Sequence, residues 1–569
     1  MSTAERPRSR VRRTPTVVAL DVLAWVALVL FVLLTVGATL IEDRVFLSTD
    51  LLSLVAPWAS AGDVPLGAVS YHVGDTIDSV APQTMAIVES VKAGGLQQWQ
   101  PDSAGGFELG GLPNSGIWSP LSVPWFIFPS AVAPAVVKIL EIGAITLGMS
   151  LLLRRFGLPS FTWPVASIVF ASSGFMLAWT NWPQTRVAAF IPLLFWAIDR
   201  AAALARPRDA VPVALVLTSM LCGGFPAIVG YALYAGGAYA VARGIQRHRS
   251  VVGVLRAVAV NAGGLVLSVG LSAVLLVPFI VNALSILDFS VREQSTAAKL
   301  GLDDLASMVV PSMTGTADGR IIVDGSPIEG LSYIGVAALA LALLAVMLPA
   351  TRRELGMPLV FALAGVLVCI TLVYLGGPLL ALAQSLPILG DNYIGRLRVI
   401  MGFFLAVAAA FGLARLTDRD SPARRTIASV AYHPTAWQRV GVPLALAVVG
   451  SVIVGVVQTQ SETSARFAAE LGRDALNALL LAAGTGLVVV VVLLAGHRSV
   501  RLVAAAALVV LVAVPATSTA STWWPSSDRS TFYPETPTHE FLEANTGESR
   551  LATVGEAMKP GTSSVYGLR

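Results

Sequence analysis

Two aspartates in one long polar segment have the residue type and the setting for chemistry. Asp50 and Asp78 each stand at the start of an apolar stretch that can form a helix. There the carboxylate would either cap the helix or be held beside an apolar boundary. A carboxylate withdrawn from water has a raised pKa, so it can act as a general base at neutral pH. Asp43 of the same segment is a third candidate, and a solvated surface is the alternative for any one of these acids.

Four arginines near the ends of apolar stretches could bind a phosphate group. They are Arg186, Arg292, Arg396 and Arg398. A guanidinium presents parallel N–H donors that match a phosphate, whereas the alternative is an anchor that reaches toward lipid headgroups. Arg396 and Arg398 favour phosphate binding, because residues two apart on a helix point in different directions and an anchor needs only one of them.

Other residues near the apolar stretches have plainer interpretations. Lys138 and Glu141 lie three residues apart, so a helix would place them on one face and pair them. A functional polar path through the membrane is the alternative. Four tryptophans fit an aromatic belt at a membrane surface better than platforms for stacking a sugar. These are Trp58, Trp99, Trp118 and Trp125.

The elements that must position these residues are membrane-spanning helices. Of the 569 residues, 55% are hydrophobic and 13% are charged, whereas soluble domains carry about 25% charged residues. This composition excludes an ordinary soluble enzyme and a disordered chain. Two cysteines in apolar runs are too few for a disulfide framework or a cysteine zinc site. The sequence has no Gly-rich phosphate loop with a lysine, and its basic residues form no cluster that indicates nucleic acid.

A bilayer core of about 30 Å requires roughly 20 apolar residues per helix. On that basis the sequence predicts an all-α polytopic bundle of about 13 spans. They lie near 18–41, 131–153, 159–179, 187–203, 211–224, 226–243, 254–284, 331–350, 357–383, 397–416, 440–459, 474–496 and 501–519. The fifth and sixth spans are short and meet at Gly223-Gly224-Phe225-Pro226, so they form either a tight hairpin or a broken re-entrant pair.

Lysines and arginines set the expected orientation, because cationic loops resist translocation. The basic tail 1–17 is expected in the cytoplasm. Alternation from this tail places most of the 38 Lys and Arg residues inside and most of the 34 acidic residues outside. The transmembrane domain 18–519 then ends with the C-terminus outside. The first apolar run is too long for a signal peptide and lacks a small-residue cleavage site, so it is expected to be an uncleaved anchor.

Three outer segments are long enough to carry function. They are 42–130, 285–330 and 520–569. The first is the richest, and it is expected to hold an amphipathic helix near 76–93 on the membrane surface. The third is short for an independent core and stops without a terminating feature, which indicates the start of an extracytoplasmic C-terminal domain that is interrupted.

Several short motifs follow one another in a fixed order along most of the chain. They include Thr49-Asp50-Leu51-Leu52, Pro57-Trp58, Trp99-Gln100-Pro101, Asn114 to Pro120, Trp182-Pro183-Gln184-Thr185-Arg186, Gly223-Gly224-Phe225-Pro226, Ser290-Val291-Arg292, Ser332-Tyr333-Ile334-Gly335, Gly395-Arg396-Leu397-Arg398 and Phe532-Tyr533-Pro534-Glu535-Thr536-Pro537. The ordered set resembles the YfhO-like bacterial membrane proteins, which belong to the GT-C glycosyltransferases.

The resemblance implies a GT-C-like bundle with a large first extracytoplasmic loop in the bacterial plasma membrane. It implies an enzyme that moves a sugar from a polyprenyl phosphate to an extracytoplasmic acceptor, which is an envelope polymer, a glycolipid or a protein. Asp50 matches the first aspartate of the loop and is favoured as the base over Asp78, with Asp43 third. The four arginines would bind the lipid phosphate, and Trp99 and Asn114 would contact substrate.

The resemblance does not determine whether the enzyme requires a metal ion. Some GT-C enzymes require a divalent cation and others do not, and oxygen ligands alone do not distinguish magnesium from manganese.

Two other classes of function remain as alternatives. A transporter or flippase of a lipid-linked envelope precursor would place charges at the membrane midplane on broken helices. Only Lys138, Glu141 and the break at 223–226 favour it. The third possibility is a non-catalytic assembly scaffold.

Overall fold

The computed structural model is almost entirely helical in the part of the chain that it describes. The described residues are 15–61, 71–95, 99–101, 106–108, 116–286, 299–317, 326–347, 356–417, 465–494, 498–547, 549–555, 557–559 and 561–569. Among them, strands occur only as two short antiparallel pairs.

Eight of the described helical segments are long and apolar enough to cross a membrane. They are Val17–Ile41, Ala133–Arg155, Pro183–Leu204, Val251–Ser285, Gly356–Leu375, Ile394–Thr417, Leu471–Val491 and Leu502–Trp523. Apolar helices of about 20 residues match the thickness of a bilayer. The protein is therefore an all-α, multi-pass membrane protein, as its composition predicts.

These eight segments coincide with eight of the predicted spans. The predicted spans 159–179, 211–224, 226–243 and 331–350 overlap helices that are not among the eight, so the total of about 13 stays a prediction. Residues 440–459 lie outside the described part of the chain. The predicted span 159–179 is broken into α7 (Thr162–Ala171) and α8 (Gly174–Ala178). At the break the N–H of Gly174 donates to the carbonyl of Tyr333 at 2.7 Å, so the backbone of a distant segment takes the place of a helical partner.

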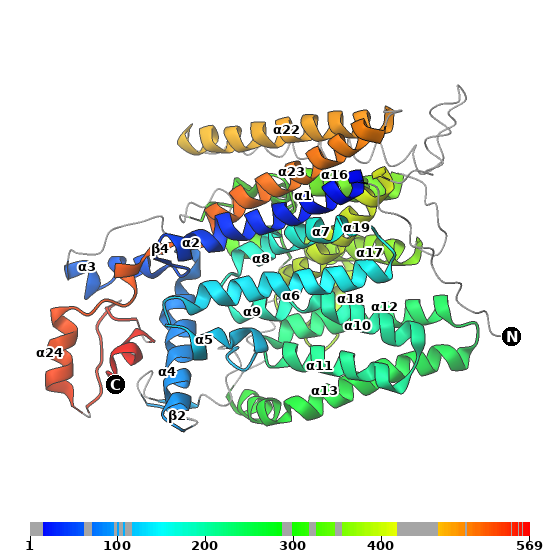
Figure 1. Ribbon diagram of the computed structural model, residues 1–569. Coiled ribbons are helices and arrows are strands. Elements are labelled where there is room, and N and C mark those ends of the chain that lie inside the picture. The colour runs from blue at the N-terminus through cyan, green and yellow to red at the C-terminus, as the bar shows by residue number, and fades with distance from the viewer. Residues whose placement is uncertain are drawn as a thin grey trace.

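The helix α19 (Arg398–Thr417) forms the centre of the bundle, and its whole apolar window is buried. The helices α7, α16 (Val336–Met347) and α17 (Gly356–Ile370) pack directly around it. By contrast, α13 (Val251–Ile286) and α22 (Ala465–Leu494) lie on opposite outer edges in Figure 1. Little of their apolar surface is buried, as expected for helices that face lipid.

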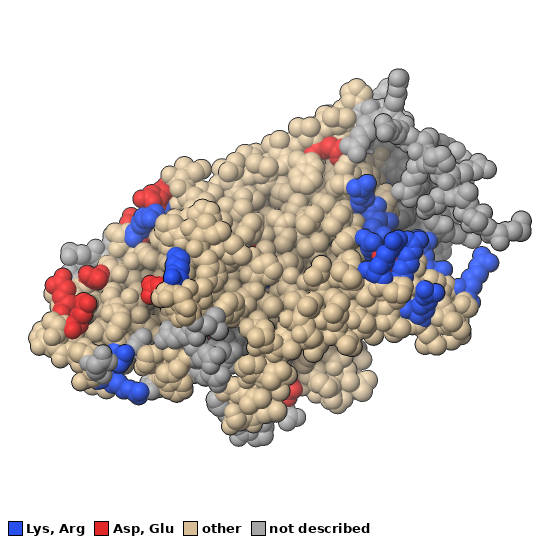
Figure 2. All heavy atoms as spheres, turned by 60° about the horizontal axis from the view of Figure 1, so that its bottom comes forward, with Lys and Arg blue, Asp and Glu red and all other residues tan. Residues whose placement is uncertain are grey.

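Basic side chains are most concentrated at one end of the bundle, whereas the other end carries acidic and basic side chains together (Figure 2). Figure 2 shows the largest group of basic side chains at one end. The exposed arginines near that end include Arg154, Arg206, Arg208, Arg247 and Arg249. We call this end, where α1 (Pro15–Val32) begins, the basic end, and the other the cap end. This concentration of basic side chains (Figure 2) follows the charge pattern on which the expected orientation depends, while the orientation itself stays a prediction.

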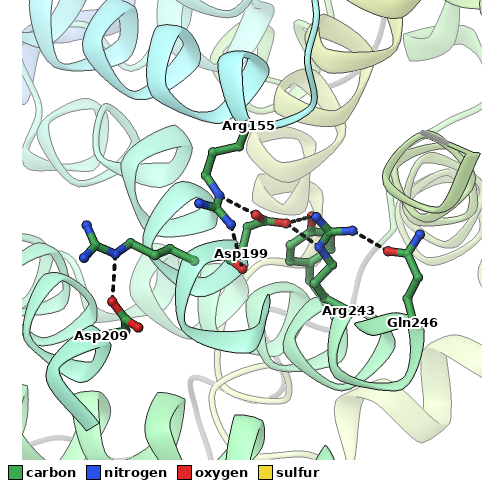
Figure 3. Close-up of polar contacts among 7 residues, drawn as sticks. Arg155, Asp199, Asp209, Arg243 and Gln246 are labelled. Carbon is green, nitrogen blue, oxygen red and sulfur yellow. Dashed lines mark hydrogen bonds and ion pairs between the residues drawn. The ribbon is translucent and has the colours of Figure 1, made fainter. Parts of the chain in front are cut away.

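A buried ion cluster joins three helices at the basic end (Figure 3). Asp199 of α10 (Ile191–Leu204) lies 2.5 Å from Arg155 of α6 (Ala133–Arg155) and 2.6 Å from Arg243 of α12 (Pro226–Arg247). The hydroxyl of Tyr239 also donates to Asp199, at 2.9 Å. One buried carboxylate thus balances two guanidinium groups, which gives the cluster a structural role.

The first polar segment and the C-terminal tail together form a cap over the other end of the bundle. In Figure 1, α4 (Ala81–Lys92) stands across the ends of the bundle helices, and α24 (Pro537–Thr546) lies at the outer edge, with the C-terminal segment between them. Strand β1 (Arg44–Val45) pairs with β4 (Ser527–Asp528) of the tail. We use the name cap for residues 44–61, 71–95 and 526–569 as far as the structure describes them.

One hydrophobic core joins the two segments of the cap. It includes Trp58, Ile77, Tyr533, Met558 and Leu568. The tail therefore packs on the first segment within a shared core, a contact that the sequence analysis did not foresee. The helix predicted near 76–93 is present as the π-helical turn Thr76–Val80 followed by α4.

Candidate functional site

Asp50 lies in the interior of the cap. It belongs to the 3-10 helix Thr49–Leu54 and is 1% exposed. The Ser527 hydroxyl lies 2.8 Å from Oδ1 of Asp50 and 2.7 Å from the carbonyl oxygen of Leu47, so its one proton serves two acceptors. The other carboxylate oxygen, Oδ2, is buried and accepts no hydrogen bond from any described residue. Burial raises the pKa of the Asp50 carboxyl, and the hydrogen bond from Ser527 offsets part of that rise.

Asp78 lies nearer to the surface of the cap. Its side chain is 18% exposed, and Oδ2 lies 3.2 Å from Nζ of Lys559 in the tail. Burial raises the pKa of the Asp78 carboxyl, and the Lys559 ammonium offsets part of that rise. Asp78 is therefore accessible from solvent in this conformation, whereas Asp50 is enclosed.

Neither aspartate caps a helix, which corrects one interpretation of the sequence. The residues at the two N-cap positions are Ser48 and Asp75, and neither makes a side-chain cap bond. The third candidate, Asp43, is 76% exposed and pairs with Arg529 at 2.6 Å. The solvated-surface alternative therefore describes Asp43 alone among the three.

Arg186 lies buried inside the bundle at the cap end. Its Nη1 donates to the hydroxyl of Ser122 at 3.0 Å, and it belongs to α9 (Pro183–Ala188). The guanidinium lines a cavity of about 10 Å³, which is room for one water molecule. The other lining residues are Leu47, Thr76, Val80, Ala81, Trp125, Pro134, Val137 and Asn181. The cavity thus joins Arg186 to the two chain segments that carry Asp50 and Asp78.

A glycine allows the chain to pass closely beside Arg186. Gly116 has a φ of +57°, and a Cβ there would lie 3.1 Å from Nη1 of Arg186 and 2.6 Å from the carbonyl oxygen of Gly223. Only glycine adopts this conformation in that space at low cost. The motif around Gly223, where α11 (Ala210–Leu221) gives way to α12, therefore reaches the same region as Arg186.

The predicted pairing of Lys138 with Glu141 is confirmed. Nζ of Lys138 lies 2.6 Å from Oε2 of Glu141, and both side chains are buried. The hydroxyl of Thr185 donates to Oε1 of Glu141 at 3.0 Å, and Nζ of Lys138 lies 5.4 Å from the ring centroid of Trp524. Because Arg186 follows Thr185 directly, the pair lies next to the Arg186 cavity.

Arg396 forms an ion pair within a group of aromatic rings. Its Nε and Nη2 both donate to Oε1 of Glu329, at 3.0 and 2.6 Å. Its guanidinium carbon lies 4.5 Å from the ring centroid of Trp179 and 5.5 Å from that of Phe225. The second carboxylate oxygen of Glu329 is buried and has no hydrogen-bond partner among the described residues.

Arg398 has different partners from Arg396, as their spacing predicts. Its Nε and Nη2 donate to the carbonyls of Gly395 at 2.8 Å and Ile328 at 3.0 Å, and its Nη1 donates to the carbonyl of Leu331. The buried guanidinium thus ties the start of α19 to the segment 328–331. This arrangement gives Arg398 a structural role.

The remaining sequence candidates lie elsewhere. Arg292 and Asn114 fall outside the described residues. Trp99 lies in the short strand β2 (Trp99–Gln100) and is largely exposed. The aromatic-belt interpretation is wrong for Trp58 and Trp125, because both are buried.

Four residues of this region escaped the sequence analysis. They are Trp179, Glu329, Ser527 and Lys559. Trp179 carried a usable signal, since it precedes Trp182 of a quoted motif by three residues beside a helix break. The other three become relevant only through contacts between segments far apart in sequence, which no local pattern reveals.

Known proteins offer no direct guide to this site. No protein-family model matches the chain, and no curated protein matches it. Among the described residues, no group of three or more His, Cys, Asp or Glu side chains could hold a metal ion.

Proposed function

We propose that the protein is a GT-C-like, YfhO-like membrane glycosyltransferase that moves a sugar from a polyprenyl phosphate to an acceptor outside the cytoplasm. The proposal includes about 13 spans, a cytoplasmic N-terminus and an extracytoplasmic cap in a bacterial plasma membrane. The observation that carries it is the cavity at Arg186, which is bounded by the segments that hold Asp50 and Asp78. A buried cation at the same end of the bundle as two carboxylates with raised pKa suits the departure of a lipid phosphate and the uptake of a proton.

The proposed reaction is a single displacement. The oxygen of an acceptor hydroxyl bonds to the anomeric carbon of the donor sugar, and the bond from that carbon to the phosphate oxygen breaks. The hydroxyl proton passes to an aspartate, and the electron pair leaves with the phosphate. Arg186 stabilises the phosphate charge by hydrogen bonds from its guanidinium. This course inverts the anomeric configuration.

The structure bears on which aspartate acts as the base. The sequence favours Asp50, but Asp50 is enclosed beneath Ser527 of the tail. Asp78 is the carboxylate that an acceptor reaches from solvent, after it displaces the Lys559 ammonium. We therefore assign the base to Asp78 and keep Asp50 as the alternative, which acts if strand β4 moves aside.

The test is transfer by the purified full chain in proteoliposomes. The donor is a labelled monosaccharide on polyprenyl phosphate, and the acceptors are a panel of alkyl glycosides. Asp78→Asn should lower transfer by about 10²- to 10⁴-fold, the usual worth of a general base. Asp43→Asn, at the exposed aspartate of the same segment, serves as the matched control and should transfer normally.

Two outcomes would contradict the proposal. Transfer that survives both Asp78→Asn and Asp50→Asn would remove the mechanism. Movement of the intact labelled lipid across the bilayer without transfer would favour the transporter alternative, for which the buried pair of Lys138 and Glu141 is the structural argument.

A further inference from the structure

Buried polar atoms without hydrogen-bond partners gather where α8 leads into α9. Among the described residues, none of three atoms there has a partner: Nε1 of Trp179, Nε1 of Trp182 and Oε1 of Gln184. Trp179 is 5% exposed and Gln184 is 2% exposed. Most buried polar groups in proteins are hydrogen-bonded, so three such atoms in so short a segment call for a ligand or ordered water.

A complementary acceptor lies in the same group of side chains. Glu329 uses only Oε1 to bind Arg396, and its buried Oε2 has no partner in the described part of the chain. Arg396 in turn covers the ring of Trp179 at 4.5 Å, and the rings of Trp179 and Trp182 lie 5.2 Å apart. The contacts therefore connect two free indole donors with one free carboxylate oxygen. We call Trp179, Trp182, Phe225, Glu329 and Arg396 the aromatic cluster.

The aromatic cluster has the chemistry of a site for a neutral, hydroxyl-rich ring. Its one carboxylate and one guanidinium pair with each other, so it offers no net charge to a ligand. The indole rings meet edge to face, at 77°, and aromatic walls with few placed polar groups are typical of small-molecule sites. The side chains of Arg396 and Glu329 remain 19% and 18% exposed, so the cluster reaches the surface there, while Oε2 of Glu329 and the two indole N–H groups lie just beneath it.

A single buried indole N–H without a hydrogen-bond partner does not by itself indicate a ligand site, as Trp163 illustrates. Trp163 lies in the first turn of α7, near the basic end, and its buried Nε1 also lacks a partner among the described residues. Nothing in the described structure places a free carboxylate oxygen beside it. The aromatic cluster differs because free donors, a free acceptor and aromatic faces occur together.

We propose that the aromatic cluster binds the sugar ring of the substrate, with Oε2 of Glu329 accepting from sugar hydroxyls and the indole N–H groups of Trp179 and Trp182 donating to sugar oxygens. This inference rests on the proposed function and adds a substrate class to it. The cluster selects neutral sugars and disfavours uronic acids, because a second carboxylate would repel Glu329.

Direct binding to the full chain in nanodiscs tests this inference. The probes are citronellyl phosphate, its glucoside, its glucuronide and octyl glucoside, each followed by calorimetry. The citronellyl phosphate glucoside should bind at least about tenfold more tightly than either the glucuronide or citronellyl phosphate alone. If octyl glucoside shows the same dependence on the cluster, the ring bound there is that of the acceptor.

Two conservative variants and one control test whether the sugar-dependent binding occurs at the aromatic cluster. Trp179→Phe keeps an aromatic ring and loses only the indole N–H, and Glu329→Gln keeps the side-chain shape. A hydrogen-bond contribution of about 1–3 kcal/mol predicts that each weakens the sugar-dependent binding by about 5- to 150-fold. Trp163→Phe removes an equally unpartnered indole N–H outside the cluster and should bind like the wild type.

The outcomes separate this inference from the proposed function. If no transfer occurs but sugar-dependent binding is lost in Trp179→Phe, the binding site stands and the transferase proposal fails. If transfer occurs and both variants keep the wild-type affinity and sugar preference, the inference is overturned and the transferase proposal stands. Equal binding of the glucoside and of citronellyl phosphate by the wild type would also overturn it.

Discussion

The buried pair of Lys138 and Glu141 should respond asymmetrically to mutation. The ammonium and carboxylate lie 2.6 Å apart, and Arg186 interacts electrostatically with both. Lys138→Met leaves the carboxylate with the hydroxyl of Thr185 and the charge of Arg186. Glu141→Gln instead removes the carboxylate that both cations face, and leaves two buried like charges near each other.

The structure allows the sizes of the two effects to be ordered. Removal of one partner from a buried ion pair costs about 3–5 kcal/mol. Lys138→Met should lower the free energy of unfolding by about 3 kcal/mol, because two favourable partners of Glu141 remain. Glu141→Gln should lower the free energy of unfolding by about 5 kcal/mol. Compared with Lys138→Met, this raises the equilibrium constant of unfolding by a further factor of about 30. The double variant with Met at 138 and Gln at 141 should be more stable than Glu141→Gln alone, since one of the like charges is gone.

Unfolding in mixed micelles, followed by tryptophan fluorescence, measures these differences. Asp43→Asn is the matched control, because it breaks an ion pair of the same 2.6 Å length that is exposed. Such exposed pairs contribute about 0–1 kcal/mol. This order of effects is wrong if both buried-pair variants are as mild as the control, or if Lys138→Met costs more stability than Glu141→Gln.

Three further changes have defined outcomes. The pKa of Asp50 is raised in the folded protein, so its ionisation lowers the free energy of unfolding as pH rises from 3.8 toward the raised value. At pH 7, Asp50→Asn should therefore unfold at a higher denaturant concentration than the wild type. At pH 3, where Asp50 is protonated in both states, the two proteins should unfold at the same concentration. Arg398→Lys cannot donate in the guanidinium geometry to three carbonyls, so thermal unfolding should reveal a loss of about 2–4 kcal/mol; an unchanged midpoint would contradict the structural role. Gly561→Ala would drive a Cβ into the carbonyl oxygen of Asp78, so limited proteolysis should release the tail faster than in the wild type.

Local patterns predicted an all-α, multi-pass membrane protein and the eight helical segments that are long enough to span a bilayer. Long apolar runs identify spans because each must cross the same thickness of hydrocarbon. The three-residue spacing of Lys138 and Glu141 likewise fixed their pairing, since it places both on one face of a helix. The helix after Asp78 was predicted from the helical periodicity of its apolar residues.

The composition of the candidate site depends on contacts that local patterns do not contain. The burial of Asp50 follows from strand β4, whose Ser527 comes from the far end of the chain. The partner of Arg396 is Glu329, which belongs to a short helix in another segment, α15 (Pro327–Gly330). The sequence predicted phosphate binding for both Arg396 and Arg398. Their different partners show that Arg398 is structural, whereas Arg396 belongs to the aromatic cluster.

Counting the two products formed by the wild-type protein tests transferase activity most directly. The purified chain is supplied with a labelled neutral sugar on polyprenyl phosphate, and mass spectrometry quantifies free polyprenyl phosphate and glycosylated acceptor. Transferase activity predicts one polyprenyl phosphate released for each sugar transferred, with neither product formed by Asp78→Asn at more than a hundredth of the wild-type rate. Intact donor recovered on the opposite face of the membrane, with no polyprenyl phosphate released, would contradict it.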